Sequence, residues 1–154
     1  MKLILCRNNT LGSWALRTAM WSRYSHSAIY DEATGLVYDS TLLQGGVRAT
    51  LWLDWMQHYP ERELRRMNVI DVAGARLWLD AQVGKPYDWS ALVGMAAHRA
   101  WQDDDAWFCS ELTEACASLW GVPRFRAEMA RITPRHQEML ADWGLADVAT
   151  GVQG

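Results

Sequence analysis

Three cysteines are the candidate nucleophiles of this 154-residue chain, and their surroundings differ. Cys6 lies inside the apolar segment 1–7 and Cys116 lies between two alanines, so both are expected to be small buried hydrophobic residues. Cys109 stands at the entrance of a predicted helix. The free N–H groups and the dipole of a helix N-terminus stabilise a thiolate and can also bind the oxyanion of an attacked carbonyl. We therefore predict Cys109 as a catalytic thiolate nucleophile.

A thiolate nucleophile needs an imidazole that takes its proton, and the chain has four histidines. His58 falls in a predicted surface turn, and His98 and His136 fall in predicted helices, so all three are expected to be exposed polar residues. His26 instead opens an otherwise apolar strand. We predict His26 as the general base; the alternative is a hydrogen-bonded structural histidine.

A hairpin relates His26 to a carboxylate. If residues 31–34 form a four-residue loop, His26 falls directly opposite Asp39, and opposed side chains come within about 5 Å at Cβ. Asp39 would then orient the imidazole and stabilise its protonated form, as the third member of a triad does. A register slip of one residue would place Ser40 there instead. The alternative for Asp39 is a turn residue at the end of its strand.

The elements that must position these residues change in kind along the chain. Strands concentrate in the first half and helices in the second, which favours one α+β domain over residues 1–154, an antiparallel sheet or small barrel packed against helices. The predicted strands are 2–7, 25–30, 36–40, 47–49 and 63–70. The predicted helices are 11–23, 51–58, 72–83 with Asp71 as cap, 88–101, 107–120, and one from Pro134 towards Trp143.

Composition excludes several classes of function. A net charge of −3 gives no support to nucleic-acid binding, and no segment approaches the about 20 apolar residues of a membrane span. The N-terminal apolar run is too short for a signal peptide, and three cysteines without a paired pattern suit a reducing compartment, so we expect a cytoplasmic protein. The alternative is a phage-encoded protein or one that leaves the cytoplasm by a dedicated export or lysis route. The histidines share no metal-ligand spacing and no phosphate-binding glycine loop is present, so we predict no metal and no cofactor. Oligomeric state stays open.

Two short segments carry a family resemblance. Gly-Lys-Pro-Tyr-Asp-Trp at 84–89 and Trp-Phe-Cys-Ser-Glu-Leu at 107–112 resemble segments of the NlpC-type cysteine peptidases. The predicted histidine strand precedes the cysteine helix, which is the order of the circularly permuted papain-like branch. This branch includes the YiiX-like amidases of bacteria and phages and, more remotely, the lecithin:retinol acyltransferase group. The Phe-Cys-Ser-Glu-Leu form is more similar to the YiiX-like members than to the acyltransferases, which carry an Asn-Cys-Glu type of motif.

This resemblance implies roles for five residues. Cys109 would be the nucleophile and His26 the general base. Asp39 would take the third polar place, where the branch commonly has glutamate or histidine, and Tyr87 with Asp88 would line the substrate cleft. The acidic run 103–105 departs from the pattern, because negative charge beside the nucleophile opposes thiolate formation unless it points into solvent.

The function expected from these residues is hydrolysis of an acyl bond, most simply an amide, through a Cys109 acyl-enzyme. The substrate would be a peptide, a peptidoglycan fragment or a lipid. One alternative keeps the fold but acts on lipids or thioesters, with the tryptophan-rich segment 51–56 as an apolar surface near the cleft. The other is a non-catalytic binding or structural protein. Most of the ten tryptophans are expected to be packing residues, with an aromatic substrate groove as the minority reading.

Overall fold

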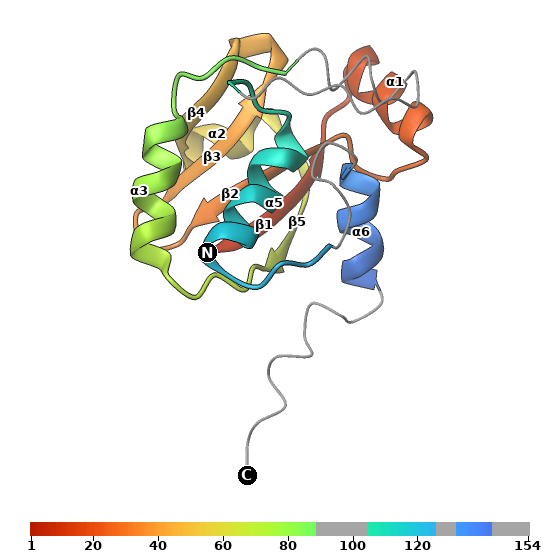
Figure 1. Ribbon diagram of the computed structural model, residues 1–154. Helices are drawn as coiled ribbons and strands as arrows, with labels where there is room; N and C mark the ends of the chain where they lie inside the picture. The colour runs from red at the N-terminus through yellow and green to blue at the C-terminus, as the bar shows by residue number, and fades with distance from the viewer. Residues whose placement is uncertain (89–104, 126–131, 143–154) are drawn as a thin grey trace.

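The computed structural model describes residues 1–88, 105–125 and 132–142. Within them, five strands form one antiparallel sheet in the order β4-β3-β2-β1-β5 (Figure 1). The strands are β1 (Lys2–Arg7), β2 (His26–Asp31), β3 (Leu36–Thr41), β4 (Gly46–Leu51) and β5 (Glu61–Arg66). The helices are α1 (Leu11–Met20), the 3₁₀ turn η1 (Leu42–Gln44), α2 (Trp52–His58), α3 (Val72–Gln82), α5 (Cys109–Trp120) and α6 (Pro134–Asp142).

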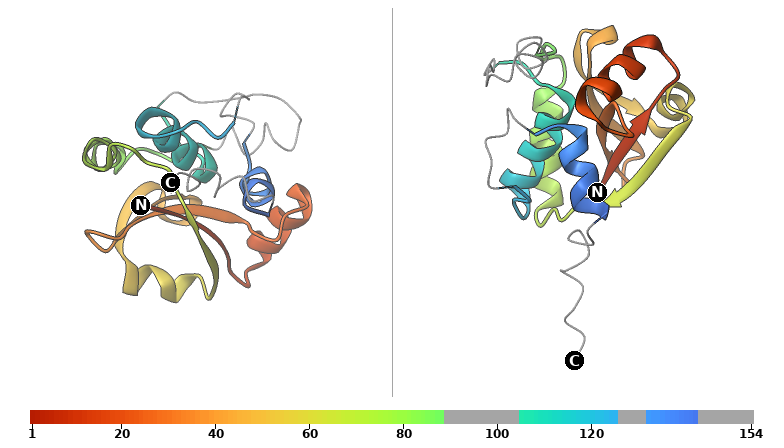
Figure 2. Two further views of the ribbon diagram at one scale, coloured as in Figure 1. Left: turned by 90° about the horizontal axis from the view of Figure 1, so that it is seen from below. Right: turned by 90° about the vertical axis from the view of Figure 1, so that its right-hand side faces the viewer.

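The sheet is curved and has helices on both of its faces (Figure 2, left). Apolar side chains are buried on each face. Helices α3 and α5 cover one face, where Ile29, Tyr38 and Leu112 belong to the largest buried cluster. Helix α2 covers the other face, where Trp55 is fully buried against Ile4 and neighbouring side chains. The predicted α+β fold with helices packed on an antiparallel sheet is confirmed, and the sheet is open, with β4 and β5 at its edges.

Most predicted elements are present with small changes at their ends. The strand over residues 2–7 is found as predicted, and Asp71 caps α3 by accepting a hydrogen bond from the Gly74 N–H at 2.9 Å. Helix α1 ends at Met20, three residues early, because Trp21 adopts the left-handed conformation. The strand predicted at 63–70 is shifted to Glu61–Arg66. The helix predicted at 88–101 and most of the acidic run lie outside the described residues.

The register of the β2–β3 hairpin differs from the prediction by two residues. Ile29 pairs with Tyr38, whereas the predicted loop would have paired it with Leu36. The reason lies in Asp31, which belongs to the strand and closes the turn: its carboxylate accepts hydrogen bonds from the Ala33 N–H and the Thr34 hydroxyl. The loop is therefore residues 32–35, and Asp39 does not lie directly opposite His26.

No helix in the described ranges is long and apolar enough to cross a membrane. A cytoplasmic location and the lack of nucleic-acid binding stay predictions.

Candidate active site

The imidazole of His26 and the carboxylate of Asp39 are in contact despite the altered register. His26 is the first residue of β2 and Asp39 lies near the end of β3, so the antiparallel pair brings both to one end of the sheet. The distance from His26 Nε2 to Asp39 Oδ2 is 3.0 Å. Both side chains are buried, with 8% of His26 and 0% of Asp39 exposed. The expected pair of imidazole and carboxylate is present, and Nδ1 is the ring nitrogen left for a second partner.

Two further donors hold the carboxylate of Asp39. Arg48 lies directly opposite Asp39 in the β3–β4 pair and donates from Nε to Oδ1 at 2.8 Å. Trp55 of α2 donates from Nε1 to Oδ2 at 2.8 Å. Burial alone would raise the pKa of Asp39, but the hydrogen bonds and positive charges of His26 and Arg48 hold it below its usual range. Asp39 is therefore a fixed negative charge beside the imidazole.

The same charge acts on His26. Burial alone would lower the pKa of the imidazole, but hydrogen bonding to Asp39 and to Cys109, together with their negative charges, raises the pKa to about 9. Tyr59 stacks on the ring with centroids 5.1 Å apart and planes 13° apart, and it fixes the ring plane. The imidazole is held in one orientation and favours its protonated form.

Cys109 is the first residue of α5, which begins two residues after the predicted start at Trp107. The helix begins here because Leu112 donates its N–H to the Phe108 carbonyl at 3.1 Å, and Glu111 accepts the Phe108 N–H through Oε2 at 3.0 Å. The latter contact is one half of a capping box. The N–H groups of the first turn have no partner inside the helix, and Cys109, which opens this turn, is 2% exposed.

Backbone pairing connects this helix start to the sheet. The Ser40 hydroxyl, next to Asp39, donates to the Trp107 carbonyl at 2.6 Å. Trp107 in turn donates its N–H to the Pro86 carbonyl at 3.0 Å. Segment 84–88 follows β4 closely, because Gly46 has no Cβ; an added Cβ would lie 2.0 Å from the Lys85 oxygen. Ser40 of β3, the strand that carries Asp39, and Gly46 of β4 therefore position the segments that precede Cys109.

Tyr87 and Asp88, predicted to line a cleft, lie beside the nucleophile. Tyr87 packs edge-on against Phe108, with ring centroids 5.7 Å apart, in the cluster that contains Cys109. Burial and then the negative charge of Cys109 raise the pKa of Tyr87. Asp88 is buried and donates its backbone N–H to the Trp107 carbonyl at 3.3 Å. All five predicted site residues are thus gathered at one end of the sheet.

Sequence reasoning missed three side chains of this site. The sequence held a signal for Arg48, because a hairpin with a four-residue loop that ends at Gly45 pairs Arg48 with Asp39. Trp55 had none, because its contact depends on how α2 crosses the sheet. Glu111 is buried, its Oε1 makes no hydrogen bond, and its pKa is raised to about 7 by burial and by the charge of Asp88, against the lowering effect of the Phe108 N–H.

The donor set does not form a metal centre. Among the described residues, no three His, Cys, Asp or Glu side chains are grouped so that they could hold an ion. The oxygens of Asp39 are bonded to Arg48 and Trp55, and Nε2 of His26 is bonded to Asp39. The other two thiols, Cys6 and Cys116, are buried, and burial raises the pKa of each, that of Cys116 to about 12.

Comparison with known proteins gives a likeness in fold. No protein-family model matches the chain, and no curated protein matches it. Among solved structures, the metalloprotein YiiX from Escherichia coli O157:H7 is similar, with a TM-score of 0.61 over 92% of this chain and 79% of that chain. The two sequences are 21% identical, so the likeness concerns the fold. It agrees with the resemblance to YiiX-like proteins noted in the cysteine segment.

Proposed function

We propose that this protein is a cysteine hydrolase that cleaves an amide bond through a Cys109 acyl-enzyme, on a circularly permuted papain-like, NlpC-type fold. The observation that carries the proposal is the buried His26 ring. It is bonded to an ionised Asp39 through Nε2, and it interacts with the thiol at the start of α5. An imidazole held between a carboxylate and a thiol at a helix N-terminus is the arrangement that acyl transfer requires.

In the proposed reaction, Nδ1 of His26 has already taken the Cys109 proton before substrate binds, in keeping with its raised pKa, and the thiolate then attacks the carbonyl carbon. The C–S bond forms, and the electron pair of the C=O bond moves to an oxyanion that the Cys109 N–H binds. His26 then gives its proton to the amine as the C–N bond breaks. A water molecule loses a proton to His26 and attacks the thioester, which releases the acid and restores the thiol. Asp39 stays ionised throughout and stabilises the imidazolium.

The name of the YiiX structure describes that protein as a metalloprotein. In this chain the polar atoms of His26 and Asp39 are bonded to each other and to Arg48 and Trp55, and they do not fit a metal ion. We therefore derive no step of the proposed reaction through a metal.

The exposed leucines of the 51–56 segment are the observation that favours the alternative substrates, lipids or thioesters. Leu51 is 57% and Leu53 68% exposed, whereas Trp55 of the same segment is fully buried. This arrangement offers two apolar side chains rather than a continuous apolar groove. Amide hydrolysis is therefore the preferred reaction, with acyl transfer to a non-water acceptor as the second candidate.

The test has two stages because the substrate is not known. First, iodoacetamide should alkylate Cys109 rapidly at pH 7, as intact-mass measurement and peptide mapping detect, and His26→Ala should slow this reaction. Second, the wild-type protein is incubated with peptidoglycan peptides, with phospholipids and with acyl thioesters, and products are identified by mass spectrometry. Cys109→Ala should abolish turnover, whereas Cys116→Ala, in the same helix, should retain it. Turnover that survives Cys109→Ala, or an ordinary alkylation rate at Cys109, would overturn the proposal.

A further inference from the structure

Helix α1 presents a leucine and a tryptophan to solvent, although Leu16 and Met20 of the same helix are half-buried. Leu11 is 86% exposed and Trp14 is 61% exposed, while Ser13 is buried and lies 2.7 Å from the Ser25 hydroxyl. Trp21, directly after the helix, is 88% exposed. Leu11 and Trp14 lie one turn apart on the exposed side of the helix. Trp21 follows the end of α1, so two large apolar side chains of the helix and one beside it face solvent.

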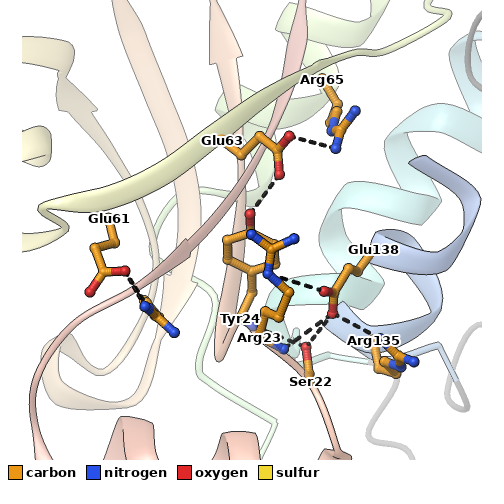
Figure 3. Close-up of polar contacts among 9 residues, drawn as sticks. Ser22, Arg23, Tyr24, Glu61, Glu63, Arg65, Arg135 and Glu138 are labelled. Atoms are coloured by element: carbon orange, nitrogen blue, oxygen red, sulfur yellow. Dashed lines mark hydrogen bonds and ion pairs between the residues drawn. The ribbon is translucent and has the colours of Figure 1, made fainter. Parts of the chain in front are cut away.

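The backbone around Trp21 is held in an unusual conformation. Trp21 has φ 50° and ψ 42°, a left-handed geometry that a bulky residue rarely adopts. The segment is fixed from α6, because the buried carboxylate of Glu138 accepts the Ser22 hydroxyl and the Arg23 N–H, both at 3.2 Å (Figure 3). Arg135 pairs with the same carboxylate at 3.4 Å. The structure thus keeps a strained tryptophan in solvent, and such strain points to a function.

Residues of α1 and the segment 21–23 border a shallow hollow of about 500 Å³ with cationic character. Among the described residues, its lining consists of Trp14, Arg17, Thr18, Trp21, Ser22 and Arg23, so two tryptophans and two arginines face it. Arg23 also pairs at 3.8 Å with the Glu138 carboxylate, whose side chain is 2% exposed. The chain as a whole carries a net charge of −3, so the sign of this surface is opposite to that of the protein. An anionic occupant with an apolar part is the chemistry that complements it.

We propose that α1 and residues 21–23 dock on an anionic phospholipid bilayer. The arginines would contact lipid phosphates, and Leu11, Trp14 and Trp21 would enter the interfacial region, where tryptophan is favoured. A second copy of the chain fits less well, because a two-fold contact through this surface would bring its two arginines, Arg17 and Arg23, close to the same positive surface of the partner. The proposal is independent of the reaction at Cys109.

The test measures co-sedimentation of the full chain with sucrose-loaded vesicles, either of phosphatidylcholine alone or of an equal mixture with phosphatidylglycerol. The wild-type protein should sediment with the anionic vesicles, less so at high salt. A Trp14→Ser/Trp21→Gly variant should lose about tenfold or more of this binding. Arg17→Gln should lose about fivefold on anionic vesicles. Leu77→Ser, which removes a leucine that is 72% exposed on α3, is the matched control and should bind as the wild type does.

Glycine at position 21 relieves the left-handed backbone, so the double variant should stay folded, as its melting temperature will report. Loss of binding in a folded double variant supports the proposal. The proposal would be overturned if the wild-type protein did not bind anionic vesicles, or if the double variant bound them as well as the wild type does. A third result would also overturn the proposal: the wild-type protein is a dimer in light scattering and does not bind vesicles, and the double variant is a monomer. The exposed face would then bind a second copy of the chain.

Discussion

Replacing Asp39 with asparagine removes the charge that the site places beside His26 while keeping the shape of the side chain. In the wild-type protein, Asp39 accepts hydrogen bonds from three side chains, His26, Arg48 and Trp55. An asparagine has one oxygen to offer and turns an NH₂ group towards the remaining donors. The variant therefore weakens the hold on the imidazole and leaves the guanidinium of Arg48 without its buried counter-charge.

The structure sets the size of the effect. Folding raises the pKa of His26 from 6.5 to about 9, a difference worth about 3 kcal/mol at about 1.4 kcal/mol for each pKa unit. Because the folded state binds the proton more tightly, this stability is fully present below pH 6.5 and is lost as the pH rises through 9. Asp39 supplies one of the two hydrogen bonds and one of the two charges that raise the pKa. With burial unchanged, Asp39→Asn should lower the pKa of His26 to below about 8.

The assay is an NMR titration of the histidine Cε1–H signals from pH 5 to about 10, with His26→Gln to assign the resonance. The wild-type midpoint should lie near 9 and that of Asp39→Asn at least one pH unit lower. The unfolding free energy, measured in guanidinium chloride, should fall between pH 6.5 and 9 in the wild type and fall less in the variant. A wild-type midpoint near 6.5, or equal midpoints in both proteins, would refute the reasoning. Cys109→Ala should lower the midpoint too; if it does not, the imidazole and the thiol are not coupled.

Three further substitutions test the elements around the site. Gly46→Ala should cost about 2 kcal/mol or more in denaturant unfolding, because its Cβ would lie 2.0 Å from the Lys85 oxygen at φ 145°. Trp21→Gly should raise the unfolding free energy by up to about 1 kcal/mol, because glycine adopts the left-handed backbone without strain and the tryptophan side chain that is removed is exposed. A lower unfolding free energy would contradict this account. Glu111→Gln should keep the bond to the Phe108 N–H but remove an acid whose pKa folding raises from 4.5 to about 7. Wild-type stability should therefore fall as the pH rises from 4.5 through 7, and the fall should be smaller in this variant when both are followed by denaturant unfolding.

The parts of the molecule that local sequence signals specify were predicted well. A capping aspartate, a proline at the first position of α6 and alternating apolar residues each act within a few residues. They placed α3, α6 and β1 within one or two residues of their observed ends. Cys109 and His26 were predicted for the same reason, since each stands at the first residue of an element.

Contacts between elements that are distant in the sequence could not be predicted from such local signals. Trp55 reaches Asp39 because α2 crosses the face of the sheet from which that carboxylate projects. The Ser40 hydroxyl reaches the Trp107 carbonyl across 67 residues of sequence. Neither pairing has a local pattern, because each depends on how complete elements pack. Glu111 was overlooked for a different reason: a glutamate three residues after a cap is ordinarily an exposed capping residue, whereas here the helix start is buried.

The hairpin shows why an error in register left the predicted pair intact. Side chains alternate between the two faces of a strand, so a shift of one residue moves Asp39 to the opposite face, whereas a shift of two keeps it on the face of His26. The observed shift is two at the closed end of the hairpin, where Ile29 pairs with Tyr38, and the same register carried along the strands makes Asp39 a diagonal neighbour of His26. A diagonal neighbour is farther away at Cβ, and the imidazole closes the gap to 3.0 Å. The short arm of an aspartate is therefore sufficient here, because Arg48 and Trp55 hold the carboxylate where the ring can reach it.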